Sequence, residues 1–294
     1  MVAPDRRRLG ILAGRGELPW LAVRAALRAG EEDLRVFCIT DEAPPPDLKE
    51  YAEPIVLTRF YSSAIRAMKR HQIGRLLLLG KATRDILYRN PRFDLRTVFL
   101  LARMMNQSDY SIFEYLADEL RKYDIEIIPQ HTYLGELFLS PGRYGKRLTK
   151  AELLDVAFGL LHAREMNRLD IGQTVVIGKR SVLAVEAAEG TDRCIRRGGE
   201  LFHKRGAVVC KLSKVNHDMR FDIPTVGSST LESMQESGCR VLAFDSKRTF
   251  IVDPRLFLKQ ASSLRISVLA LEPVPGLENT DYLRKLNARS ARIS

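Results

Sequence analysis

Several features that would assign a function directly are scarce in this chain of 294 residues. No apolar run approaches the roughly 20 residues that a membrane-spanning helix needs, and no signal peptide is visible at the N-terminus. The few cysteines are widely spaced and form no Cys-x-x-Cys pair, which argues against a zinc or dithiol site. We therefore expect a cytoplasmic protein without disulfide bonds. The four cysteines are Cys38, Cys194, Cys210 and Cys239.

Two common kinds of catalytic or cofactor pattern are also missing. There is no Ser-His-Asp order and no histidine pair at helical spacing, so a serine hydrolase and a zinc enzyme have little support. The turn Gly14-Arg15-Gly16 begins a dinucleotide fingerprint, but Pro19 stands where the third glycine should be. No acidic residue clearly closes the second strand in the register that binds ribose. A plain tight turn and a nucleotide site both stay open here, and an oxidoreductase is disfavoured.

Acidic residues are outnumbered, with 36 Asp and Glu against 47 Lys and Arg and a net charge of +11. Such a balance favours anionic partners, namely phosphate groups, nucleic acid or an acidic membrane face. The basic residues are mostly scattered, and no recognisable nucleic-acid-binding motif accompanies them. We expect no nucleic-acid partner, and a basic but unspecialised surface remains the alternative.

What the sequence does contain is a regular alternation of strands and helices, which predicts an α/β protein with a parallel, doubly wound sheet. In the first part, the opening Leu9–Pro19 stretch is followed by expected strands at Leu34–Thr40, Ile55–Leu57, Arg75–Leu79 and Ile125–Ile128, and by expected helices at Tyr61–His71, Leu95–Met105 and Ser111–Tyr123.

A linker rich in glycine precedes a capped amphipathic helix and a second α/β domain. That domain is expected to contain a hairpin over Thr174–Glu186, then strands and helices in alternation, and a short helical pattern at Tyr282–Asn287. The predicted boundaries are 1–135 for the N-terminal domain, 136–148 for the linker, 149–272 for the C-terminal catalytic domain and 273–294 for a basic extension.

Polar segments at the ends of strands are the places where chemistry is expected, because ligands bind at the carboxyl ends of parallel strands. Lys81 and Arg84, in Gly80-Lys81-Ala82-Thr83-Arg84, would suit a diphosphate, or else belong to a helix cap with solvated charges. Gln173 and the Glu189-Gly-Thr-Asp192 turn suggest a polar cluster at one sheet end. The alternative is that Asp192 only complements the dipole of a helix that begins there.

The segment Lys214–Gly227 concentrates charge around a proline turn. In an extended stretch Asp218, Arg220 and Asp222 share one face, since side chains repeat with period two. Such a row can hold a divalent cation and a phosphate oxygen together. A charged surface loop with an Asp-x-Pro turn is the alternative interpretation.

Together these segments resemble one family, the LpxI-type UDP-2,3-diacylglucosamine pyrophosphatases. The similarity implies Mg²⁺-dependent hydrolysis of UDP-2,3-diacylglucosamine to UMP and 2,3-diacylglucosamine 1-phosphate, with water attacking the sugar-side phosphorus. It also implies a Rossmann-like N-terminal domain and a distinct C-terminal domain, with the ligand in a cleft between them. The matching segments are Leu9–Pro19, Gly80–Arg84, His131, Arg168–Gln173, Leu183–Asp192 and Lys214–Gly227.

The same resemblance implies roles for individual residues. Asp222 stands at the family's essential aspartate and would bind Mg²⁺ or orient water, with Asp218 as a second ligand or as hydrogen-bond support. Arg220, Lys81 and Lys214 are candidates for the diphosphate oxygens. The remaining expected substrate contacts are Gly14, Gly16, Ala82, Thr83, Arg84, His131, Gln173, Glu189, Thr191, Asp192 and Thr225.

Two departures from the family pattern stand out. Ser108-Asp109-Tyr110 replaces a common Gly-Asp-Asp, and His217 replaces a frequent glutamine. These changes leave open a pyrophosphatase for another nucleotide diphosphate, or a non-catalytic nucleotide-binding protein. The expected partners are the acylated UDP-sugar and the anionic inner face of the inner membrane, bound peripherally and in a salt-sensitive way, with a homodimer left open.

Overall fold

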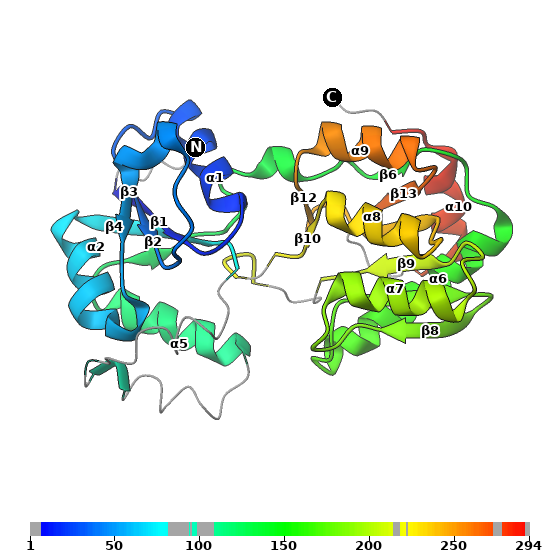
Figure 1. Cartoon of the computed structure of the whole chain (residues 1–294), viewed down its shortest axis with the longest axis horizontal. Coiled ribbons are helices and arrows are strands. Elements are labelled where there is room, and N and C mark those ends of the chain that lie inside the picture. The colour runs from blue at the N-terminus through cyan, green and yellow to red at the C-terminus, as the bar shows by residue number, and fades with distance from the viewer. Residues whose placement is uncertain are drawn as a thin grey trace. The chain divides into compact units, whose positions relative to one another are not determined.

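Figure 1 shows the chain as a computed structural model, which describes residues 7–81, 94, 96–98, 109–213, 218–221, 223–272 and 278–291; for 109–112 only the backbone is described. The chain divides into two compact units. Unit 1 comprises Met1–Leu134 together with Asp218–Phe221, and unit 2 comprises Gly135–His217 and Asp222–Ser294. A short segment from the C-terminal half of the sequence is therefore part of the N-terminal unit.

Unit 1 is built on a five-stranded sheet with the order β3-β2-β1-β4-β5 and parallel pairing throughout. This is the order of the first five strands of a Rossmann fold, which confirms the predicted class. Its strands are β1 (Arg8–Ala13), β2 (Leu34–Cys38), β3 (Ala52–Pro54), β4 (Ile73–Leu79) and β5 (Glu126–Ile127), and its helices include α1 (Leu18–Arg28), α2 (Arg66–Arg70) and α5 (Asp109–Arg121).

Two predicted elements of unit 1 differ from the structure. The strand expected at Ile55–Leu57 is wrong, because the edge strand is β3 and Leu57 already begins a 3₁₀ turn. The helix expected from Tyr61 begins as a π-helix at Phe60–Ile65 before becoming α2. Side chains from a later segment accept hydrogen bonds from the first amides of this helix; for example, Phe60 N donates to Thr97 Oγ1 at 3.0 Å. Most of the predicted helix Leu95–Met105 lies outside the described residues.

Unit 2 contains a six-stranded sheet with the order β6-β13-β11-β9-β7-β8. Strands β9, β11 and β13 are parallel, and β6, β7 and β8 each run antiparallel to a neighbour. The strands are β6 (Gly142–Tyr144), β7 (Thr174–Gly178), β8 (Ser181–Val185), β9 (Val208–Lys211), β11 (Val241–Asp245) and β13 (Ser267–Leu271), with a separate pair β10 (Thr225–Val226) and β12 (Phe250–Ile251).

The range predicted as a linker, 136–148, is in part a strand of this sheet. Tyr144 of β6 pairs with Val268 of β13, so the chain has already entered the second sheet before the first long helix. That helix, α6 (Lys150–Arg168), begins with the predicted capping box between Thr149 and Glu152. The other helices of unit 2 are α7 (Thr191–Leu201), α8 (Ser228–Glu236), α9 (Pro254–Ser263) and α10 (Thr280–Ala288).

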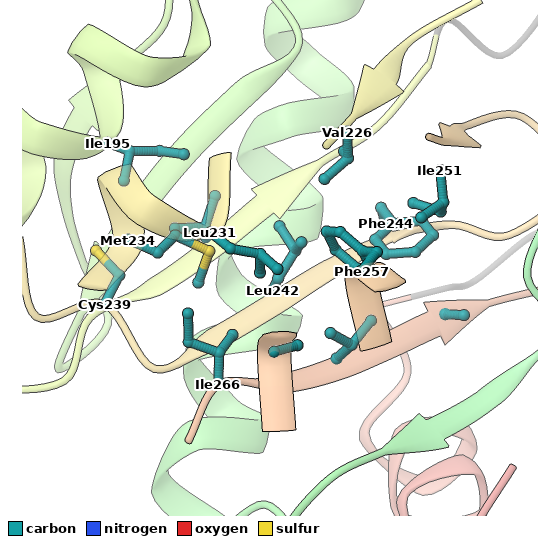
Figure 2. Close-up of a cluster of buried hydrophobic side chains, with 14 of the residues drawn as sticks. Ile195, Val226, Leu231, Met234, Cys239, Leu242, Phe244, Ile251, Phe257 and Ile266 are labelled. Atoms are coloured by element: carbon teal, nitrogen blue, oxygen red, sulfur yellow. The ribbon is translucent and has the colours of Figure 1, made fainter. Parts of the chain in front are cut away.

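Helices cover both faces of the second sheet. One core cluster joins α7, α8 and α9 to alternate strand residues such as Val176 and Leu242, as Figure 2 shows around Leu231 and Phe257. The other joins α6 and α10 to the intervening residues such as Val175 and Val241. This alternation follows from the period-two geometry of strands. None of the helices in the described ranges combines the length and apolar character that a bilayer crossing requires.

Two consecutive glycines let α7 approach its neighbours closely. A Cβ on Gly199 would lie 2.2 Å from the carbonyl oxygen of Ser237, and one on Gly198 would lie 2.6 Å from Cβ of Val176. We predict that Gly199→Ala lowers the free energy of unfolding by about 1–3 kcal/mol, because a backbone atom must move. Urea unfolding followed by circular dichroism measures this. Gly135→Ala, which meets nothing within 4 Å, is the matched control and should change little.

Candidate functional site

Two glycine turns meet where strands β1 and β4 of unit 1 end. Arg15 and Lys81 exchange backbone hydrogen bonds of 2.9 Å in both directions. A Cβ on Gly14 would lie 2.7 Å from the carbonyl oxygen of Lys81, and one on Gly80, whose φ is +87°, would lie 2.7 Å from the carbonyl carbon of Gly14. Only glycine allows this approach. The structure thus brings the predicted residues Gly14, Gly16 and Lys81 to one sheet edge.

The amide of Gly16 is oriented toward an anionic group. Gly16 has φ +99°, and its N–H donates to Oε2 of Glu42 at 3.0 Å. A carboxylate oxygen therefore occupies a position that a phosphate oxygen would compete for, close to the start of α1. The sequence showed no acidic residue that clearly closes the second strand in the register that binds ribose. Glu42 was missed because it lies four residues beyond β2, in the loop that leads to the prolines.

Several predicted site residues lie outside the described residues, so their roles stay predictions. They include the catalytic candidate Asp222 and most of the segment after β4. The full set is Ala82, Thr83, Arg84, Lys214 and Asp222, and the two departures from the family pattern at Ser108 and His217 also lie outside the described residues.

Residues 218–221 form a turn, so the predicted extended conformation is wrong for this part of the Lys214–Gly227 segment. Phe221 N donates to the carbonyl oxygen of Asp218 at 3.0 Å, and Arg220 N donates to Oδ1 of Asp218 at 2.9 Å. The aspartate side chain caps the turn, which is a common local use of this residue type. Asp218 and Arg220 are close for this reason rather than through a shared strand face.

Two carboxylates surround the Arg220 guanidinium within the described residues, the predicted Asp218 and the unpredicted Glu114, whereas the predicted second carboxylate, Asp222, lies outside those residues. Nε of Arg220 donates to Asp218 at 2.9 and 3.0 Å, and Nη2 donates to Glu114 of α5. Burial raises the pKa of the Asp218 carboxyl, but hydrogen bonds and charge from Arg220 outweigh this, so the pKa is lowered overall. Asp218 is therefore ionised at neutral pH.

The turn is anchored to unit 1 by an aromatic side chain. Phe221 is 3% exposed and stacks on Phe113 of α5, with ring centroids 4.8 Å apart. Gln130 N donates to the carbonyl oxygen of Met219 at 2.8 Å. Gln130 precedes His131, a predicted contact residue, and burial lowers the pKa of the His131 imidazole. Residues 218–221 of the predicted catalytic segment thus lie against the loop after β5.

Unit 2 carries its own polar cluster at the carboxyl end of β9. Lys211 is only 4% exposed, and its Nζ lies 2.7 Å from Oγ1 of Thr191 and 3.9 Å from Oε2 of Glu186. Thr191, a predicted contact, donates to Oε1 of Glu186 at 2.8 Å. Lys211 and Glu186 were missed by the sequence interpretation. A lysine that ends the apolar run from Ala207 was the available signal.

The other predicted residues of unit 2 are arranged differently. The carbonyl oxygen of Gln173 accepts from Leu212 N at 3.0 Å, which places Gln173 beside the end of β9. Glu189 pairs with Arg197, whose hydrogen bond lowers the pKa of that carboxyl, so Glu189 acts within unit 2 as an ion-pair partner. Asp192 lies in the first turn of α7, where it complements the helix dipole. Thr225 is on β10, in the separate two-stranded sheet.

A buried aspartate holds Ser213, the residue that precedes the Lys214–Gly227 segment. Asp245, 3% exposed at the end of β11, accepts from Ser213 N at 3.2 Å and from Ser213 Oγ at 3.1 Å, both through Oδ2. Its Oδ1 accepts no hydrogen bond from the described residues. Burial raises the pKa of the Asp245 carboxyl, and the bonds from Ser213 only partly oppose this.

This raised pKa predicts a pH dependence. Between the unfolded pKa and the higher folded one, the folded chain binds more protons than the unfolded chain. The free energy of unfolding therefore falls as pH rises through that window. The loss caused by ionising the buried Asp245 carboxyl is complete above the folded pKa. We predict that the stability of Asp245→Asn relative to the wild type increases as pH rises above the usual range of an aspartate carboxyl. Urea unfolding at several pH values measures the difference; the exposed Asp118→Asn should show no such gain.

Carboxylate oxygens are the donors that Mg²⁺ prefers, usually one or two from the protein together with substrate phosphates. Asp218 and Glu114 supply two such groups around Arg220, so their chemistry fits this ion. No cluster of three or more His, Cys, Asp or Glu that could hold a metal occurs among the described residues. A Mg²⁺ site would therefore draw on the substrate diphosphate and on Asp222.

The fold and these strand-end groups define a two-domain α/β protein suited to a phosphorylated ligand. Residues 8–137 match the model of the LpxI N-terminal domain, and residues 140–269 match that of the LpxI C-terminal domain. The chain belongs to the LpxI family. It is 29% identical over 279 residues to the UDP-2,3-diacylglucosamine pyrophosphatase LpxI of Caulobacter vibrioides, covering 91% of this chain and 98% of that protein.

Proposed function

We propose that this chain hydrolyses the diphosphate of UDP-2,3-diacylglucosamine to UMP and 2,3-diacylglucosamine 1-phosphate, a step of lipid A biosynthesis. The observation that carries the proposal is the match to a protein of that name over 98% of its length. Membership of the LpxI family makes the chain a pyrophosphatase, a hydrolase of phosphoric anhydrides.

The chemistry required is charge neutralisation and the positioning of water, because hydrolysis of a diphosphate needs no protein nucleophile. Bound Mg²⁺ would neutralise charge on the diphosphate oxygens. Asp222 would bind that ion or orient the attacking water, next to the anchored Phe221. Asp218 keeps the guanidinium of Arg220 in place, and Arg220, Lys81 and Lys214 would offset the charge of the diphosphate.

In unit 2 we assign a phosphate or sugar contact to the beginning of α7. The Thr191 hydroxyl is held by both Lys211 and Glu186, so its orientation is fixed before a ligand arrives. The amides of the first helical turn favour an anion. Gln173 borders the same strand end and would contact the same ligand.

We further propose that the enzyme works in the cytoplasm, on the inner face of the inner membrane. Its net charge of +11 supports association with an anionic leaflet, where each nearby Lys or Arg contributes about 1 kcal/mol. Co-sedimentation with anionic vesicles should be strong at low salt and weak at high salt. Equal binding to neutral vesicles would contradict this.

The direct test of the reaction is to incubate the protein with UDP-2,3-diacylglucosamine and Mg²⁺ and to detect UMP. We expect stoichiometric UMP and 2,3-diacylglucosamine 1-phosphate, and no reaction with excess EDTA. In ¹⁸O-labelled water the label should enter the sugar phosphate, because attack is expected at the sugar-side phosphorus. Absence of UMP in the presence of Mg²⁺ would refute the proposal, and label in UMP would refute the position of attack.

A further inference from the structure

We propose that unit 2 contains a second anion site, separate from the strand-end groups, which binds the phosphate group of a phosphate ester. The site is a cavity of about 410 Å³ between the start of α6 and helix α10. Its cationic lining residues are Arg147, Lys150 and Arg284, and its inner wall includes Leu148, Leu153 and Asn287. Helices α6 and α10 contact each other in unit 2 (Figure 1).

The inner wall of the cavity is rigidly built. Asn287 is 2% exposed, and its side-chain amide exchanges two hydrogen bonds of 3.0 Å with the backbone of Leu148. Nε of Arg143 donates to the carbonyl oxygen of Asn287 at 2.7 Å. These bonds fix α10 against the segment that leads into α6. The cavity therefore exists before any ligand binds, and binding need not first order its walls.

The charge of the cavity is positive and only partly compensated. Arg147 and Lys150 are exposed, and neither has an ion-pair partner within the described ranges. Arg284 shares its charge with Asp281, one helical turn away at 3.1 Å. The nearby carboxylate of Glu152 is engaged by the capping box with Thr149, at 2.7 and 2.8 Å.

Arginine and lysine side chains that line one cavity favour phosphate, since charge-assisted hydrogen bonds to its oxygens are among the strongest that proteins form. The cavity exceeds the size of one phosphate and has leucines in its wall. This combination fits a phosphate that carries an organic group. Such a group occurs both in phospholipid headgroups and in soluble phosphate esters.

The cavity lies only partly in the matched family region, since Arg147, Leu148 and Lys150 fall within it. The LpxI C-terminal domain match ends at residue 269, whereas α10 begins at Thr280. Arg284 and Asn287 therefore come from a helix outside that match. Since none of the cavity residues belongs to the proposed reaction, this binding can be measured without turnover and stands or falls separately from it.

Two double variants with the same change in net charge test the proposal. The cavity variant is Arg147→Glu with Lys150→Glu, and the control is Lys146→Glu with Lys285→Glu, which are exposed neighbours that do not line the cavity. Glutamate at position 150, in the first turn of α6, suits the helix dipole. Should the cavity variant not fold, Arg147→Gln with Lys150→Gln replaces it, against the matching glutamine control.

The probes are glycerol 1-phosphate, followed by isothermal titration calorimetry, and vesicles with or without phosphatidylglycerol, followed by co-sedimentation. We expect the cavity variant to bind glycerol 1-phosphate at least about tenfold more weakly than the control, since two charge-assisted contacts are replaced by like-charge repulsion. If the cavity variant also binds the phosphatidylglycerol vesicles more weakly than the control, the natural ligand is a lipid headgroup. If the two variants differ only in binding glycerol 1-phosphate, the natural ligand is a soluble phosphate ester. Equal binding by both variants to both probes would overturn the proposal.

Discussion

Asp222→Asn should reduce Mg²⁺-dependent release of UMP by about 10²–10⁴-fold, because an amide neither orients a proton-losing water nor binds a hard cation as a carboxylate does. The measurement is the initial rate with UDP-2,3-diacylglucosamine, with circular dichroism to show that the fold is intact. The exposed Asp118→Asn makes the same chemical change on α5 and should retain the wild-type rate.

Full turnover of a folded Asp222→Asn variant would mean that the catalytic carboxylate lies elsewhere. Asp218→Asn gives a further comparison. Its carboxyl is bonded to Arg220 at 2.9 Å, and its loss should disturb the turn and lower the rate less than the change at Asp222.

Phe221→Ala should lower both stability and turnover, although Phe221 touches no reacting atom. Removing a side chain that is 3% exposed and stacked on Phe113 costs about 3–5 kcal/mol of unfolding free energy. Asp222 follows directly, and a displacement of about 1 Å can cost roughly 10²-fold in rate. We therefore predict a fall of this size in kcat/KM, measured below the unfolding temperature of the variant.

Two further variants separate anchoring from general destabilisation. Phe113→Ala removes the partner ring and should reproduce the loss of turnover. Gly199→Ala destabilises unit 2 at a place remote from this contact in the chain and should leave kcat/KM near the wild-type value at low temperature. Wild-type turnover by Phe221→Ala would show that this contact does not position Asp222.

Much of the fold follows from local patterns in the sequence. The leucine-rich run of β4 is buried along its whole length, and the capping box at Thr149 and Glu152 marks the start of α6. The errors occur where elements are short or depend on distant groups. β6 has only three residues and no readable period, so its range was predicted as linker. The first amides of the helix after Leu57 are bonded to residues more than thirty positions later, including Thr97.

The site residues show the same contrast between local patterns, which the sequence reveals, and contacts with distant groups, which it does not. The glycine turns and the charged segment before Pro224 were visible because each is contiguous in the sequence. Glu114 was not, since it meets Arg220 across 106 positions. Lys211 was hidden as well, because a buried lysine depends on Thr191 and Glu186 from other elements. The lysine that ends the apolar run from Ala207 was a local signal, but the partners in contacts of this kind are set by tertiary structure.

We propose above all that this chain acts on an acylated UDP-sugar, and a comparison of substrates tests this most directly. Initial rates of UMP formation can be measured with Mg²⁺ for UDP-2,3-diacylglucosamine and for UDP-glucosamine, which lacks both acyl chains. We predict rapid formation of UMP and 2,3-diacylglucosamine 1-phosphate from the acylated compound and little from the other. Equal rates, or UMP only from the unacylated nucleotide, would contradict the claim and indicate a pyrophosphatase for a different nucleotide diphosphate.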